Sequence, residues 1–113
     1  DANTGLASAS ASATIASTTP GTSSTLSAGT AGYNTGVTSS QASGSGTITV
    51  AVPFVGGAST GGGLDTTLRT LASSNGTASN AVLTLTNNVA IDAITPSATD
   101  YTDTITVVGA GLF

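Results

Sequence analysis

The stretch Asp100-Tyr-Thr-Asp-Thr-Ile-Thr-Val-Val-Gly-Ala-Gly-Leu-Phe113 decides the fold class of this chain. The odd-numbered positions carry the large apolar residues Tyr101, Ile105, Val107 and Phe113, with Asp103 among them near the start. Threonines occupy the even-numbered positions, the other parity. Period-two alternation with β-branched residues is typical of a strand that has one buried face. We therefore expect residues 101–113 to form the closing strand of an all-β domain.

The composition excludes several classes of protein. Ser and Thr supply 39 of the 113 residues, whereas the charged residues are five Asp and one Arg, and Lys, Glu, His and Cys are absent. A chain with one cation is not a nucleic-acid binder, because phosphate contacts need Lys and Arg. No run of eighteen apolar residues is present, so we expect no membrane span. The low charge leaves little repulsion between copies and favours association.

The second informative stretch covers residues 6–18, where small apolar residues alternate with Ser and Thr. The apolar parity consists of Ala7, Ala9, Ala11, Ala13 and Ile15. A helix would spread these alanines around its circumference, whereas a strand places them on one face, so a strand fits better despite the helix propensity of Ala. A flexible leader is the alternative. A face of methyl groups suits a narrow groove between two sheets.

The middle of the chain predicts further strands. Residues 24–38 indicate one or two short strands, and residues 39–46 a polar loop. The clearest internal strand covers residues 46–55, with Ile48, Val50, Val52 and Phe54 facing inward. Residues 56–63, rich in Gly, are expected to form a flexible loop.

The later part of the chain is less regular. Residues 64–71 fit a short helix or a strand edge equally well, because Leu64, Leu68 and Leu71 have helical spacing. Residues 73–79 are expected to be a loop. Residues 80–86 and 89–94 are predicted to form a hairpin around an Asn-Asn turn. The total is about seven strands, the pattern of a β-sandwich.

Residues for catalysis or metal binding are largely missing. Without His, Cys, Lys or Glu there is no nucleophile–base pair and no zinc site, so we expect neither an enzyme nor a cofactor. The one carboxylate alternative is a calcium site at Asp92, Asp100 and Asp103, although no calcium-binding loop motif is present. Asn75-Gly-Thr77 is a sequon and predicts N-glycosylation at Asn75.

The residues Tyr101-Thr-Asp-Thr-Ile-Thr-Val107 resemble the C-terminal strand of spore coat protein U-like and related chaperone–usher pilin subunits. The segment Gly46-Thr-Ile-Thr-Val-Ala-Val-Pro53 is similar to inner strands of such subunits. The resemblance implies an incomplete immunoglobulin-like β-sandwich, completed by an N-terminal donor strand from a neighbouring subunit. It also implies an assembly chaperone as a partner.

On this resemblance we expect two parts, an N-terminal donor-strand extension and hinge at residues 1–19 and a β-sandwich domain at residues 20–113. The donor strand would present the alanine parity and Ile15. The acceptor groove would be lined by the following residues: Tyr101, Ile105, Val107, Phe113, Ile48, Val50 and Val52.

The expected function is a structural subunit of an extracellular filament, similar to a pilus or fimbria, that polymerises head to tail by strand addition. Because the chain begins at Asp1 without Met, we expect export followed by removal of a signal peptide. The alternative is a monomeric Thr-rich module. Its flat face would bind carbohydrate, a surface or ice, and consists of the following residues: Thr47, Thr49, Thr102, Thr104 and Thr106.

Overall fold

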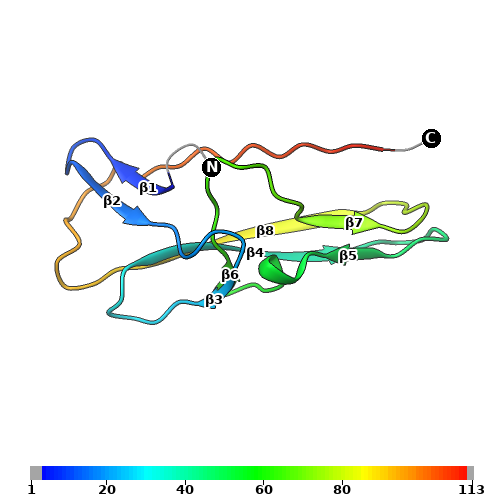
Figure 1. The fold of residues 1–113 in the computed structure, drawn as a ribbon, viewed down its shortest axis with the longest axis horizontal. Helices are drawn as coiled ribbons and strands as arrows, with labels where there is room; N and C mark the ends of the chain where they lie inside the picture. The colour runs from blue at the N-terminus through cyan, green and yellow to red at the C-terminus, as the bar shows by residue number, and fades with distance from the viewer. Residues whose placement is uncertain (1–3, 112–113) are drawn as a thin grey trace.

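The computed structural model describes residues 4–111 and shows an all-β chain with several antiparallel sheets. Its elements, in chain order, are as follows: β1 (Gly5–Ser8), β2 (Ala13–Ala16), β3 (Ser23–Thr25), β4 (Gly32–Ser40), β5 (Ile48–Val50), the 3-10 turn η1 (Val52–Phe54), β6 (Thr60–Gly62), β7 (Ala72–Ser74) and β8 (Val82–Ala90). The predicted all-β class is confirmed. The described residues are elongated, with extents of 50 × 23 × 21 Å, and β4 and β8 run along the long axis (Figure 1).

The main sheet has the strand order β3-β6-β4-β8, and β4–β8 is its longest strand pair. These two strands run antiparallel over nine residue pairs, from Gly32 opposite Ala90 to Ser40 opposite Val82. Every residue from Gly32 to Val37 is buried, because segments cover both faces of β4. The prediction of one or two strands in residues 24–38 is confirmed by β3 and β4, and β4 extends two residues into the expected polar loop.

The predicted Asn87-Asn88 turn is wrong, since β8 continues straight through both residues. Side-chain hydrogen bonds explain why no turn forms. The hydroxyl of Thr35 donates to Asn87 Oδ1 at 2.8 Å, and Asn88 Nδ2 donates to Asn34 Oδ1 at 3.0 Å. Each asparagine therefore has a partner on the neighbouring strand, and both fit an extended backbone. Residues 91–95 form a bend and turn instead of a second hairpin strand.

The Gly-rich loop expected at residues 56–63 contains strand β6, which lies between β3 and β4. Gly61 packs directly on the backbone of Thr35, and a Cβ on Gly62 would lie 2.6 Å from ring atoms of Phe54. No side chain fits between these surfaces. The glycines therefore allow close backbone packing in the sheet interior, whereas the sequence pattern alone indicates flexibility.

The internal strand predicted at residues 46–55 is shorter than expected. Only Ile48–Val50 pairs, with β7, and the chain then turns through η1. Phe54 is buried, as predicted, but the inward position predicted for Val52 is wrong, because its side chain is 81% exposed. Pro53 lies inside η1, where its fixed φ favours a turn over further pairing.

Residues 64–71 form neither of the predicted elements and run as an irregular segment. Leu64 is buried and Leu71 packs against the core, but Leu68 is 76% exposed. The hydrophobic core is small. Its buried cluster is Val37, Phe54 and Leu64, with Ile105 and Leu85 among the residues packed against it.

The closing strand predicted at residues 101–113 is not paired as a strand in the single chain. Only Thr102 pairs, with Ala7, through two backbone hydrogen bonds of 3.0 and 2.9 Å. Residues 103–111 continue as an extended arm, called the C-terminal arm below, that runs along the molecule (Figure 1). Phe113 lies outside the described residues. Over residues 4–111, no helix has both the length and the apolar character needed to cross a bilayer.

Candidate functional site

A groove of about 1630 Å³ lies beside the C-terminal arm. Residues 64–78 form one side, residues 105–111 form another, and Thr35, Leu83 and Leu85 of the main sheet complete the lining. Several large apolar side chains in this lining are well exposed: Leu68 at 76%, Val108 at 70% and Val107 at 58%. Exposed apolar surface gathered in one groove indicates a site for another molecule or segment.

Both walls of this groove also leave backbone groups available. Over the part of the chain that the structure describes, residues 66–70 and 105–111 make no backbone–backbone hydrogen bond. These segments are largely exposed, and the Thr67 N–H donates to the Asp65 carboxylate at 3.0 Å. An extended peptide in the groove would meet apolar side chains and unpaired main chain together, the two requirements for strand addition.

Two of the residues predicted for an acceptor surface, Ile105 and Val107, line this groove. Ile48 and Val50 are half-buried on β5, with Val50 packed against the core cluster, and neither lines the groove. Tyr101 lines a separate small pocket described below.

Sequence reasoning missed much of the groove wall, including Leu64, Leu68, Leu71, Leu83 and Leu85. The sequence did contain a pattern at the first three leucines, because their spacing fits a short helix or a strand edge. The segment is irregular in the structure. It places Leu64 and Leu71 against the core and leaves Leu68 exposed in the groove.

The predicted donor segment, residues 7–15, is not a single extended strand in this chain. Strands β1 and β2 pair antiparallel in a hairpin with Leu6 opposite Ile15, and residues 9–12 form the turn. The alanine parity is therefore split, with Ala7 and Ala13 on strands and Ala9 and Ala11 in the turn. Ile15 is 4% exposed, so it is buried within its own chain. The expectation that this segment avoids its own chain is wrong for the single subunit.

Asp100 fixes the hairpin to the start of the C-terminal segment. Its carboxylate accepts hydrogen bonds from the Ser8 hydroxyl, from the Ser10 hydroxyl at 2.7 Å and from the Ser10 backbone N–H at 2.9 Å. These hydrogen bonds favour the charged form and hold the pKa of Asp100 far below its usual range. The Ala7–Thr102 pair joins the same two segments, while the buried Ile15 and the bridge from Ser17 to Tyr33 hold the second strand of the hairpin against β4.

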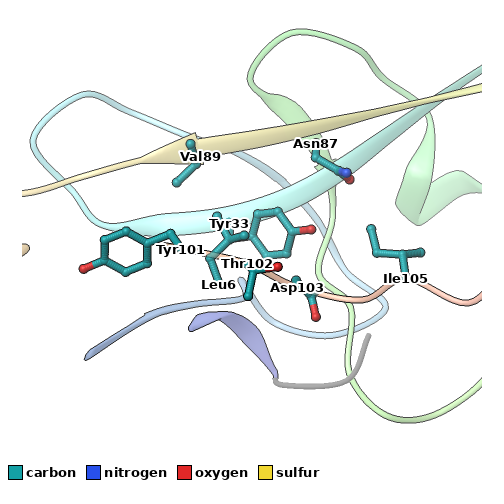
Figure 2. Close-up of a pocket in the computed structure, with 8 residues that line it drawn as sticks. All are labelled: Leu6, Tyr33, Asn87, Val89, Tyr101, Thr102, Asp103 and Ile105. Atoms are coloured by element: carbon teal, nitrogen blue, oxygen red, sulfur yellow. The ribbon is translucent and has the colours of Figure 1, made fainter. Parts of the chain in front are cut away.

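A second, smaller pocket of about 370 Å³ lies where the arm meets the sheet. Figure 2 shows Tyr33 and Asn87 of the sheet near Thr102, Asp103 and Ile105, with Tyr101 turned away from them. Tyr33 is 2% exposed, and burial raises its pKa to about 12, with a further contribution from the negative charge of Asp103. The interaction between Tyr33 and Asp103 therefore holds the start of the arm on the sheet.

The calcium alternative is not supported. The structure gathers no group of three metal-binding side chains between residues 4 and 111. Asp92 caps a local turn by accepting from Thr95 Oγ1 at 2.7 Å, whereas Asp100 binds the hairpin serines and Asp103 faces Tyr33. Each carboxylate thus has a separate structural task.

Asn75 is exposed in the turn after β7, and its Oδ1 accepts a hydrogen bond from the Thr47 N–H at 2.8 Å. Its glycosylation stays a prediction. Comparisons with known proteins add no relative: no family model, no curated protein and no solved structure matches the chain.

Proposed function

We propose that the chain is a structural subunit of an extracellular filament and that a strand from a neighbouring subunit fills the groove beside its C-terminal arm. The observation that carries this proposal is the arm itself. Residues 105–111 are extended, border an apolar groove and make no main-chain hydrogen bond to another segment in the described chain. An added strand would satisfy these groups and complete an immunoglobulin-like sandwich.

The proposed occupant is the N-terminal segment, residues 7–15, of the next copy. Its alternating alanines are small enough to enter beside the arm without displacing the leucines of the groove. For donation, the β1–β2 hairpin must open and lose its four residue pairs and the bonds to Asp100. A longer ladder against the neighbouring arm, together with burial of Leu68, Val107 and Val108, offsets this loss.

Head-to-tail strand addition does not close on itself, so it produces a fibre. The chain carries a formal net charge of −4, from five Asp and one Arg, which leaves little repulsion between subunits. The extracellular location and the assembly chaperone belong to this proposal and rest on the resemblance of the C-terminal residues to pilin subunits.

The test compares two substitutions that lie in the same turn of the free hairpin. Ala11→Asp would place a charge in the apolar groove of the neighbour, whereas Ser12→Asp lies on the opposite parity and would face away from it. We expect Ala11→Asp to abolish fibres in negative-stain microscopy and Ser12→Asp to retain them, because an unpaired buried charge costs several kcal/mol, roughly 3 or more per junction. Both variants should keep the monomer's melting temperature.

Deleting residues 1–17 provides an independent test. The shortened chain should melt at a lower temperature and form no fibres, and residues 1–17 added as a separate peptide should restore stability without fibres. An unchanged, cooperative melt of the shortened chain would contradict strand donation. Single particles of the full chain would then favour the Thr-rich binding module, whose five threonines are all exposed.

A further inference from the structure

Strand β8 presents a free edge that the proposed strand addition does not use. It is the last strand in the order β3-β6-β4-β8, and its described backbone partners all belong to β4. The groove beside the arm lies against the face of β8, at Leu83 and Leu85, not along this edge. The outer edge is therefore nine residues of strand whose outward-facing main chain is open to another strand.

This edge lacks the features that normally prevent pairing between molecules. Free edges are usually short, charged, bulged or interrupted by Pro. The sequence of β8, Val-Leu-Thr-Leu-Thr-Asn-Asn-Val-Ala, contains no charge, Pro or Gly. The opposite edge strand, β3, has only three residues. At the β3 edge, the short strand limits pairing with another molecule. The β8 edge is long and unprotected.

The sequence of β8 is complementary to itself in an antiparallel pair. With Thr86 opposite the partner's Thr86, all nine residues overlap, and Leu83 lies opposite the partner's Val89. Leu83 and Val89 are 37% and 52% exposed in the single chain, on the face that also carries the half-buried Leu85. The same register places Thr84 opposite the partner's Asn88. Four of the five distinct pairings match in polarity, and the exception is Leu85, which lies opposite the partner's Asn87.

We propose that β8 is an interface for a second copy of this chain, paired edge to edge about a two-fold axis at Thr86. The two four-stranded sheets join into one continuous sheet. Because this contact is isologous, it links copies in pairs and not into a chain. It therefore joins subunits laterally, independently of whether the groove beside the arm accepts a strand.

Single-cysteine cross-linking tests this interface in the full chain, which has no native Cys. In Thr86→Cys, the two Cβ atoms would lie about 5 Å apart across the axis. The control is Thr38→Cys, an exposed residue on β4, whose partner copy would be at least three strand spacings away, about 14 Å. We expect a short bis-maleimide to convert Thr86→Cys to a covalent dimer and to leave Thr38→Cys mostly monomeric.

A charge at the same position gives the second test. Thr86→Lys places two like charges opposite each other on the axis and should reduce dimer formation at least tenfold by light scattering, whereas Thr38→Lys should not. Equal cross-linking at positions 38 and 86, or an unchanged dimer in Thr86→Lys, would overturn the proposal. Each cysteine variant has one thiol, so fibres cannot increase the cross-linked product beyond a dimer. Failure of strand donation would leave the cross-link intact.

Discussion

At the scale of residues, a few side chains decide where the two ends of the chain lie. The carboxylate of Asp100 binds Ser8 and Ser10, which are about ninety residues away in sequence. Sequence analysis considered this Asp only as one of three carboxylates of an alternative calcium site, because a hydrogen bond between such distant residues leaves no local pattern. The alternation that marks residues 7–15 as β structure was informative, but it could not show that the strand turns back at Ala9.

The first prediction concerns the pH dependence of the hairpin. The folded pKa of Asp100 is lowered, so its stabilisation is complete above the unfolded value, about 3.9, and is lost as the pH falls through the folded value. We expect acid to lower the protection of the Ser10 N–H, measured as its exchange relative to the intrinsic rate at the same pH, and Asp100→Asn to show the same loss of protection at neutral pH.

Asp92→Asn is the control for this prediction. The pKa of Asp92 is also lowered, first by its hydrogen bond with Thr95, but that bond lies within a single turn and does not reach the hairpin. Exchange at Ser10 should therefore stay slow at neutral pH in Asp92→Asn. Slow exchange in Asp100→Asn would contradict the role given to Asp100.

At the scale of elements, the sequence predicted the all-β class but not the boundaries of several strands. Residues 56–63 were predicted to be a loop because Gly lowers strand propensity, yet the backbone contacts of Thr35 and Phe54 require Gly in β6. The Asn pair in β8 was predicted to turn because Asn tolerates turn geometry. Close packing against Thr35 and Phe54 decides the first case, and side-chain hydrogen bonds between β4 and β8 decide the second. Periodicity reports neither.

The second prediction tests the packing of β6. A methyl group at Gly62 would lie 2.6 Å from the Phe54 ring and 2.8 Å from the Pro53 carbonyl oxygen. We expect Gly62→Ala to lower the free energy of unfolding by about 1–3 kcal/mol, the usual cost of overpacking. In Gly57→Ala the new methyl group meets no atom within 4 Å, so urea denaturation should show a change of at most about 0.5 kcal/mol. Equal effects would contradict a packed role for β6.

At the scale of the whole molecule, two of the residues predicted for an acceptor surface, Ile105 and Val107, line the groove beside the C-terminal arm, and its role as an acceptor stays a prediction. Its other wall, residues 64–78, was not predicted, because an irregular segment has no periodic signal. The small core explains why the groove stays open. Only five hydrophobic residues are fully buried among those described, so the chain has little apolar material to fill it.

The third prediction uses Arg69, the sole trypsin site in the chain. Residues 66–70 are exposed, although Arg69 pairs with Asp65 at 2.6 Å and its guanidinium lies against Gly21. Trypsin resistance would need this segment to be packed, and Leu68 is exposed in the single chain. We expect trypsin to cut the monomeric Ala11→Asp variant at Arg69 and to cut fibres of the native chain far more slowly, because a donated strand covers residues 64–78. Equal digestion rates, followed by mass spectrometry, would show that this wall is not covered.

The alignment of β4 and β8 with the long axis of the molecule has a mechanical consequence (Figure 1). Tension applied along that axis pulls the two strands past each other, so the hydrogen bonds of all nine residue pairs bear the load together. The hairpin β1–β2, held by four residue pairs and the Asp100 bonds, is the weaker element. In single-molecule pulling, a subunit should first release its N-terminal hairpin at low force and lose the β4–β8 ladder only at a much higher one. In a fibre built by strand donation this hairpin is already open, so the low-force step should be absent from fibres.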